Sequence, residues 1–370
     1  MAEKKRSKKG RLGLALGAVG MLGVWVAQLA TWVSPSVFPL PALAGLGFPV
    51  FGVLLLFGVI VALRFGRWRS AMAFGFTVVL SFSLFKSTWG DFGRGMPVVS
   101  EETKALKCMS WNVRLFDRYG WLGGVKSDLF SAIRSERPDV LCVQEHFQAA
   151  SPASFPVEGP MRTALKTSQK DQVDSHVVWA REKAGRKFGV STWSRHPIVG
   201  RDAIRFGTRS NNACAITDIL WEGDTLRVFN VHFASLHFDS EDYQALEGGV
   251  PDAAGRQRMW ARMKQAYSQR VDQVTAVLNA VKASPHPVMV CGDFNETPVS
   301  WSVTAMRSTL RDAHDVRGFR LDGTWQGALP GIRIDHLLVD PEWQVLSYAT
   351  GGDGLSDHRF IAAELRVPSR

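Results

Sequence analysis

The most constraining feature of this sequence is a long apolar stretch near its amino terminus. No charged residue occurs from Leu12 to Leu63, and a Ser- and Pro-containing segment at 34–41 divides the stretch in two. Each half has roughly the 20 apolar residues that a helix needs to cross about 30 Å of hydrocarbon. We therefore predict membrane spans at about 12–33 and 37–63, too long and too repeated for a signal peptide. A third candidate at about 70–88 is shorter and contains several hydroxyl side chains.

Basic residues flank these spans on one side only. Six Lys or Arg residues lie in the tail 1–11, and Arg64, Arg67 and Arg69 separate the second and third spans. Because basic residues stay on the cytoplasmic side, the tail and the loop at 64–69 are expected inside. With three spans, the domain at 98–370 lies outside the cytoplasm, on a multi-pass protein of the cell (inner) membrane. If the third span fails to cross, that domain is cytoplasmic.

The charge of the chain is concentrated in its first quarter. The whole sequence carries a formal net charge of +10, with 44 Lys or Arg residues against 34 Asp or Glu residues. Residues 1–97 hold 11 of the basic residues and only two acidic ones, Glu3 and Asp91, which leaves 33 against 32 for 98–370. A nearly neutral domain gives little support to sequence-independent binding of nucleic acid, although a local basic patch stays open.

Four cysteines lie in segments with strand character, and none has the spacing of a metal site or of a small disulfide framework. They are Cys108, Cys142, Cys214 and Cys291. We predict buried free thiols.

The region 98–370 alternates between strand-like runs and a few helical patterns. Strands are predicted at 105–113, 140–145, 176–180, 188–193, 213–221, 225–232, 287–293, 333–339 and 358–365. Helices are predicted at 126–136, 253–283 and 300–308, while 151–174 has loop composition. This order indicates an α+β domain with two packed sheets and helices outside them.

The segment "VMVCGDFNETP" places Asp293 and Asn295 two residues apart at the end of an apolar strand. Side chains two apart on an extended segment point to the same side. An Asx turn that closes the strand explains this pair by itself. A functional explanation needs similar groups elsewhere in the chain.

Such groups recur at the ends of other predicted strands. They are Asn112, Glu145, His232, Asp335, Asp357 and His358. Several acidic groups in one place require a positive charge among them. A hard divalent cation such as Mg²⁺ or Mn²⁺ suits the carboxylate ligands, and no Cys and His cluster indicates structural zinc.

The ordered motifs W-N-V, Q-E, S-x-x-P-I, N-V-H, G-D-F-N, R-I-D-H and S-D-H over about residues 105–367 resemble the endonuclease/exonuclease/phosphatase superfamily. That superfamily includes deoxyribonuclease I, exonuclease III, neutral sphingomyelinases and inositol polyphosphate 5-phosphatases. The resemblance implies a four-layer α/β/β/α sandwich and metal-dependent hydrolysis of a phosphate ester.

The resemblance also implies roles for individual residues. Glu145 matches the principal metal ligand, with Asp357 and Asn112 beside it. Asp293 matches the residue that orients or deprotonates the attacking water, and Asn295 the one that holds this water or a phosphate oxygen. His358 matches the imidazole that hydrogen-bonds the phosphate, with Asp335 as its partner. His232 matches the histidine of the deoxyribonuclease I, sphingomyelinase and phosphatase branches.

One position departs from the apurinic endonuclease pattern. After W-N-V those enzymes carry an acidic metal ligand, whereas this chain has Arg114. Arg114 is either a phosphate contact or a solvated cap, and Asp117 could replace the missing acid if the loop folds back. Trp325, in a Gly-rich loop before the Asp335 strand, is the best aromatic candidate for substrate contact.

The sequence thus predicts a membrane-anchored, metal-dependent phosphodiesterase acting on nucleic acid or a phospholipid-like headgroup. A phosphomonoesterase for a soluble ester and an inactive binding module of the same fold remain alternatives. The bilayer and the phosphodiester substrate are the expected partners, and no obligate protein partner is predicted.

Overall fold

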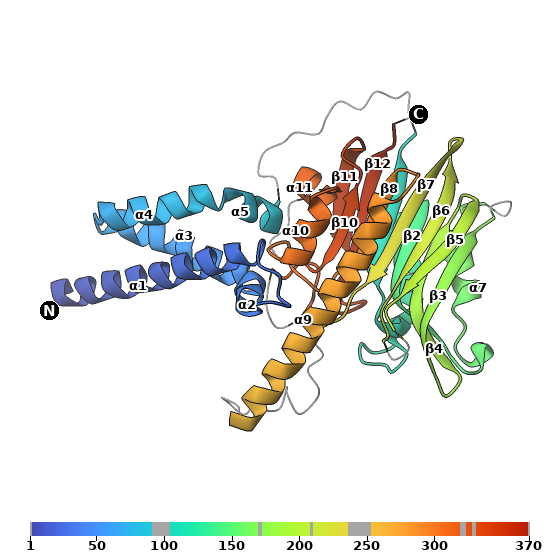
Figure 1. Ribbon diagram of the computed structural model, residues 1–370, viewed down its shortest axis with the longest axis horizontal. Coiled ribbons are helices and arrows are strands. Elements are labelled where there is room, and N and C mark those ends of the chain that lie inside the picture. Colours follow the sequence, from blue (N-terminus) through green and yellow to red (C-terminus); the bar gives the residue numbers. More distant parts are fainter. Residues whose placement is uncertain are drawn as a thin grey trace. The chain divides into compact units, whose positions relative to one another are not determined.

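A computed structural model describes residues 2–90, 104–168, 172–207, 210–235, 253–318, 323–327 and 331–368 (Figure 1). The chain divides into two compact units. The first contains Met1–Gly90, Leu236–Val271 and Glu296–Thr304, and the second contains Asp91–Ser235, Asp272–Asn295 and Ala305–Arg370.

The amino-terminal part of the first unit is helical. Its elements are α1 (Ala2–Leu29), α2 (Leu40–Leu46), α3 (Phe48–Arg64), α4 (Trp68–Leu80) and α5 (Phe82–Trp89). Within α1, the segment Gly10–Leu29 is long and apolar enough to cross a membrane. The pairs α2 with α3 and α4 with α5 are bent by 69° and 63°, and each passes the same test only as a pair. The described chain therefore has one such helix, or up to three if each bent pair is one span.

Small residues bring these helices close together. A Cβ atom on Gly17 would lie 2.6 Å from the Cα of Gly58, so α1 and α3 touch through their backbones. At the end of α2, a Cβ atom on Gly45 would lie 2.1 Å from the carbonyl oxygen of Val299, and Thr297 Oγ1 donates to the Gly45 carbonyl at 3.1 Å. The segment Glu296–Thr304 thus belongs to the same core as the amino-terminal helices. Tests of function therefore require the full-length protein.

The second unit contains two mixed six-stranded sheets. The first has the order β11-β12-β1-β2-β4-β3 and the second β5-β6-β7-β8-β10-β9. In the first sheet β1 and β2 are parallel, and in the second β7 and β8 are parallel. The strands are β1 (Leu106–Asn112), β2 (Val140–Gln148), β3 (Asp174–Lys183), β4 (Arg186–Ser194), β5 (Ile198–Arg205), β6 (Ala213–Trp221), β7 (Asp224–His232), β8 (Val288–Asp293), β9 (Arg311–Asp312), β10 (Asp335–Val339), β11 (Gln344–Gly351) and β12 (Phe360–Arg366).

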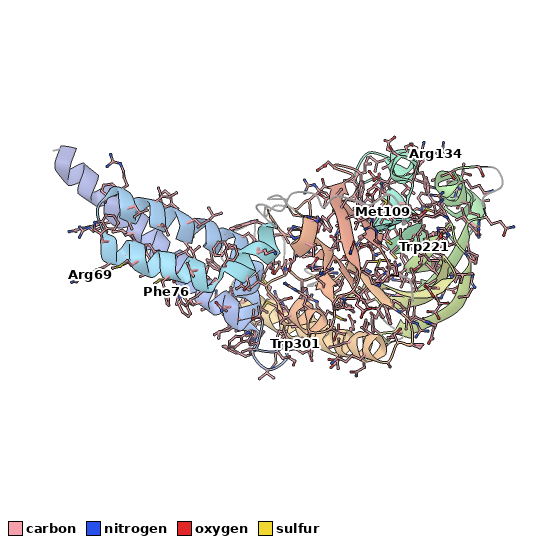
Figure 2. All side chains as sticks on the ribbon, turned by 90° about the horizontal axis from the view of Figure 1, so that it is seen from above. Arg69, Phe76, Met109, Arg134, Trp221 and Trp301 are labelled. Carbon is pink, nitrogen blue, oxygen red and sulfur yellow. The ribbon has the colours of Figure 1, made fainter. Side chains whose placement is uncertain are left out.

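The two sheets enclose a common apolar core. Leu106 and Ile361 of the first sheet are buried in one cluster with Val228 and Leu337 of the second. Trp221 lies in this cluster and is labelled in Figure 2. All four cysteines are buried and free, which confirms the prediction of unpaired thiols.

Helices form the outer layers of the sandwich. α6 (Lys126–Glu136) and α7 (Glu158–Leu165) cover the first sheet, where Met109 of β1 is buried with Ile133 and Met161 (Figure 2 labels Met109). On the second sheet, α11 (Ala313–Arg317) contributes Ala313 to the core between the sheets, and α10 (Trp301–Arg307) comes just before it in the chain. In the long helix α9 (Ala253–Lys282), Gln273 Oε1 accepts a hydrogen bond from the Ala234 backbone N–H just after β7. The predicted α+β fold of packed sheets and outer helices is confirmed.

The elements that the sequence did not predict are peripheral. β5, β9 and β11 all lie at sheet edges, α7 falls in the segment predicted as loop, and the short outer helix α11 was also not predicted. An edge strand exposes more side chains than a central one, so its hydrophobic pattern is weak.

Candidate active site

Strand ends bring the polar residues of the motifs together in the second unit. His232 ends β7, Asp293 ends β8, and Asp335 begins the antiparallel β10. The register pairs Asp293 with His232 on one side and with Asp335 on the other. Three motif residues therefore occupy adjacent positions at one end of the central strands of the second sheet.

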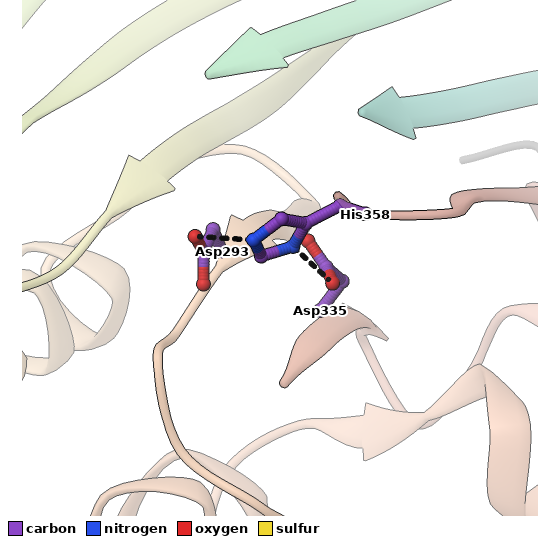
Figure 3. Close-up of side chains that lie close together, drawn as sticks. All are labelled: Asp293, Asp335 and His358. Atoms are coloured by element: carbon purple, nitrogen blue, oxygen red, sulfur yellow. Dashed lines mark hydrogen bonds and ion pairs between the residues drawn. The ribbon is translucent and has the colours of Figure 1, made fainter. Parts of the chain in front are cut away.

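Asp293 is the centre of this group and is 1% exposed. Its Oδ2 atom accepts a hydrogen bond from Asn112 Nδ2 at 3.0 Å and lies 3.7 Å from His232 Nε2 and 3.8 Å from His358 Nε2 (Figure 3 shows Asp293, Asp335 and His358). Its Oδ1 atom accepts from the Asn295 backbone N–H at 2.8 Å. That last contact is the Asx turn, so the turn and the cluster involve the same carboxylate.

His358 lies between two carboxylates. Its Nδ1 atom is 2.9 Å from Asp335 Oδ2, and its Nε2 atom faces Asp293 (Figure 3). Burial by itself lowers the pKa of His358, but the charges of Asp335 and Asp293 outweigh it and raise the pKa well above the usual 6.5. This shift favours the imidazolium, the form with an N–H on both nitrogens.

Glu145 reaches the cluster through an irregularity in β2. The register of β2 against β4 shifts between Val143 and His146, and Glu145 has a left-handed φ of 54°. Asn112 Nδ2 donates to Glu145 Oε1 at 3.2 Å, so one amide joins Glu145 to Asp293. Burial raises the pKa of Glu145; the charge of His232 opposes this and that of Asp357 adds to it. This β-bulge in β2 thus holds the Glu145 carboxylate at a position where nearby charges do not fully balance its own.

Arg114 and Asp357 form the outer edge of the cluster. Arg114 Nε lies 3.3 Å from Asp357 Oδ2, and both side chains are about one-third exposed. Ser356 Oγ donates to the Asn112 carbonyl at 2.7 Å, which ties this loop to the end of β1. Asp117 does not take the place of the missing acid. Its carboxylate accepts backbone N–H groups from Leu122, Gly124 and Val125.

Asn295 and Trp325 lie beside this group. Asn295 has a left-handed φ of 52°, and its Nδ2 donates to the Phe233 carbonyl at 3.0 Å, which leaves its Oδ1 for a ligand or water. Trp325 is half-buried and forms a β-bridge with His358 through the backbone. Contact between Trp325 and substrate stays a prediction.

The residues fit a divalent cation by their chemistry. Among the described residues, ligand atoms of Asp293, Asp335 and His358 all lie within 4.8 Å of one another. A protonated imidazole has no lone pair for a metal, so the two carboxylates are the cation ligands that this group offers. Asp335 is 1% exposed, and its Oδ1 atom has no hydrogen-bond partner in the described chain. Buried carboxylates with an unpaired oxygen are oxygen ligands of the type that Mg²⁺ and Mn²⁺ prefer. This tight group differs from the predicted ligand set of Glu145, Asp357 and Asn112, whose assignment stays a prediction.

A buried polar pair behind the site was not predicted. Gln144, the residue before Glu145, donates through Nε2 to Asn230 Oδ1 at 2.7 Å, and both side chains are fully buried. Asn230 Nδ2 in turn donates to the Ser191 carbonyl at 2.9 Å. The first bond joins β2 of one sheet to β7 of the other, and the second joins β7 to β4. In the chain, Gln144 is next to Glu145 and Asn230 is close to His232. Polar residues in otherwise apolar strand runs were the available signal.

Comparisons with known proteins agree with this geometry. The sequence profile described as "Endonuclease/Exonuclease/phosphatase family" matches residues 109–358. A solved endonuclease/exonuclease/phosphatase from Beutenbergia cavernae has a TM-score of 0.53 and 18% identity, over 71% of this chain and 72% of that one. Among curated proteins, none matches this sequence.

Two further solved structures of similar fold have more specific names. A mannosyl-6-phosphatase from Bacteroides thetaiotaomicron has a TM-score of 0.50 and 18% identity, over 71% of this chain and all of that one. A humanized D. rerio TDP2 has a TM-score of 0.50 and 17% identity, over 71% and 99% of the two chains. At these identities the likeness concerns the fold.

Proposed function

Because the chain belongs to the endonuclease/exonuclease/phosphatase family, we propose that it is a membrane-anchored phosphodiesterase that depends on a divalent metal. The proposed substrates are phosphodiesters of nucleic acid or of a phospholipid-like headgroup. Family membership supports a phosphoric ester hydrolase in general.

The observation that carries the proposal is the environment of Asp293. One carboxylate faces two imidazoles and is held by Asn112 and by its own turn. A carboxylate held in this way can accept the proton of a water that attacks phosphorus. In this proposal Asn295 Oδ1 accepts the second hydrogen bond of that water.

Charge that develops on the phosphoryl oxygens needs donors close by. His358 is kept cationic by Asp335, so its ring N–H can donate to a non-bridging oxygen. A divalent cation held by Glu145, Asp357 and Asn112 would supply Lewis-acid stabilisation of the same charge. Arg114, which lies next to Asp357, is the proposed phosphate contact.

The membrane part of the proposal rests on the amino-terminal helices. α1 contains one segment that can span a bilayer, and the two bent pairs would supply two more spans. With Lys and Arg residues at the start of α1 and at 64–69, the positive-inside rule then places the catalytic unit outside the cytoplasm. Because the four native cysteines are buried, labelling of an introduced exposed cysteine, Asp128→Cys, by a membrane-impermeant reagent on intact cells tests this orientation.

The central experiment measures hydrolysis of bis(p-nitrophenyl) phosphate by full-length protein in detergent. We expect turnover with Mg²⁺ or Mn²⁺, none in EDTA, and recovery when the metal is restored. Asp293→Ala should lower kcat by about 10²–10⁴-fold, the range for loss of a general base. Asp128→Asn, an exposed position in α6, is the matched control and should retain full activity. Unchanged turnover in Asp293→Ala would remove this mechanism.

A phosphomonoesterase is the second candidate. The structure from Bacteroides thetaiotaomicron that shares this fold is a mannosyl-6-phosphatase, which favours a terminal phosphate as substrate. Comparing p-nitrophenyl phosphate, its bis ester, plasmid DNA, RNA, sphingomyelin-type lipids and inositol phosphates separates the two candidates. No turnover of any ester by a metal-loaded protein would indicate the inactive binding module instead.

A further inference from the structure

The loop that follows β1 has an unusual backbone. Four consecutive residues, Arg114, Leu115, Phe116 and Asp117, have φ values of 44°, 55°, 56° and 52°. None of them is glycine, and each pays a steric cost in the left-handed region. Such a run persists only where the surrounding structure holds it, and strain of this kind concentrates at functional sites.

Two buried side chains hold this loop. The Asp117 carboxylate is 5% exposed and accepts three backbone N–H groups, from Leu122 at 3.0 Å, Gly124 at 2.7 Å and Val125 at 3.3 Å. Phe116 is fully buried and stacks on Phe130 of α6, with ring centroids 5.7 Å apart. These contacts anchor the loop at Phe116 and tie Asp117 to the backbone from Leu122 to Val125.

The same loop exposes two aromatic rings. Tyr119 is 48% exposed and Trp121 is 54% exposed, and their ring centroids are 5.0 Å apart. Among the described residues of the second unit, they are the only aromatic side chains classed as exposed. Two exposed rings in contact with each other offer an aromatic surface on which a planar group can stack.

Arg114 joins these rings to the Asp293 cluster. Its guanidinium lies over the Trp121 ring, 4.8 Å from the centroid, while its Nε atom is 3.3 Å from Asp357. Its backbone N–H donates to Asn112 Oδ1 at 3.1 Å, so the loop begins directly at the site. A group stacked on the rings would thus be attached close to a phosphate bound at Arg114.

We propose that Tyr119 and Trp121 form a stacking subsite for a planar aromatic group, such as a nucleobase, carried by the ester that the Asp293 cluster hydrolyses. This inference rests on the proposed function and specifies its substrate. Stacking on exposed rings beside an arginine needs no strongly basic surface, which suits a domain with 33 basic and 32 acidic residues. A lipid bilayer is a poorer match for these rings. Arg114 contacts both the Trp121 ring and Asp357, so the rings lie beside the proposed catalytic residues.

The test compares two esters in full-length protein: thymidine 5′-(p-nitrophenyl phosphate) and methyl p-nitrophenyl phosphate. We expect the ratio of their kcat/KM values to fall about tenfold in Trp121→Leu and in Tyr119→Leu, as for loss of one stacking contact. Val199→Ala removes an exposed apolar side chain of β5, away from the site, and should leave the ratio unchanged. An unchanged ratio in both ring variants would overturn the inference. Replacing thymidine by a phenyl ester then tells whether a nucleobase or any aromatic ring is preferred.

Binding provides a readout that does not need turnover. In equilibrium dialysis with Ca²⁺, wild type should bind adenosine 5′-monophosphate more tightly than glycerol 3-phosphate, and Trp121→Leu should lose that preference. If no ester is hydrolysed, the proposed function fails while this measurement still decides the subsite. Equal binding of the two ligands would overturn the inference. So would quenching of a bimane label at Trp121→Cys by brominated lipid in nanodiscs, because the rings would then face the bilayer.

Discussion

Two buried clusters of Asp and His side chains meet at strand β10, and only one of them contains a buried arginine. Asp335, at the start of β10, belongs to the Asp293 cluster. His336, the next residue, lies on the opposite side with Asp312 and Arg333, all at most 3% exposed. Both nitrogens of the Arg333 guanidinium end lie 3.0 Å from Asp312 Oδ2, and Nη1 lies 2.9 Å from His336 Nδ1.

The difference between the clusters is the presence of a buried arginine. Burial opposes the charge of Asp312, but Arg333 and His336 outweigh it and lower the pKa of Asp312 far below its usual range. Glu145, in the Asp293 cluster, has a pKa that burial raises. In a cluster with its own cation, the carboxylate charge is already balanced, so the cluster stabilises the fold without a metal. A cluster with surplus carboxylate charge needs a cation from outside, so residue composition alone does not identify a metal site.

The largest expected effect follows from removing the arginine. Arg333→Met leaves Asp312 buried without its main positive partner, which should cost about 3–5 kcal/mol of stability. Thermal unfolding of the full-length protein in detergent measures this loss. Asp312→Asn removes the charge that Arg333 balances. This companion variant should also be less stable than wild type. If Arg333→Met unfolds at the wild-type temperature, the cluster is not the structural element described above.

Metal addition should separate the two clusters directly. A ligand that binds only the folded state at 100 times its Kd stabilises that state by about 2.7 kcal/mol. We expect Mn²⁺ to raise the unfolding temperature of wild type and to lose this effect in Glu145→Gln. Asp312→Asn should be less stable than wild type but keep the Mn²⁺ increment. If Asp312→Asn lost the Mn²⁺-dependent rise in unfolding temperature and Glu145→Gln kept it, the metal would bind at the Asp312 cluster and not at the Asp293 cluster.

The smallest effect concerns pH in metal-free protein. The pKa of Glu145 is raised in the folded state, so the folded protein holds its proton longer and stability falls as pH rises above the unfolded pKa of about 4.3. The stability of Glu145→Gln relative to wild type should therefore increase as pH rises from 4 to 7. The pKa of Asp312 is lowered, so its contribution is complete above the unfolded value of about 3.9 and is lost only in stronger acid. The gap between wild type and Asp312→Asn should stay constant over that same range.

The sequence predicted the central strands well and the peripheral ones poorly. β1, β2, β7 and β8 are buried on both faces, so their continuous apolar runs were recognisable. The sequence shows Arg333 as the start of a strand and of the R-I-D-H motif, but no local pattern reveals that it faces Asp312, 21 residues away. Asp117 looked available as a ligand, although three backbone N–H groups already occupy its carboxylate. Hydrogen bonds to the backbone of a folded-back loop leave no trace in residue type.

The sequence by itself determined which parts of the chain are apolar enough to span a bilayer, which strands fill the core, and the order of the motif residues. These properties depend on composition and short-range periodicity. Tertiary structure alone decided which buried acids have a cationic partner, which aromatic rings are exposed, and which oxygens remain unpaired. Those outcomes depend on distances between residues far apart in the chain, and electrostatic energies change steeply with such distances and with burial.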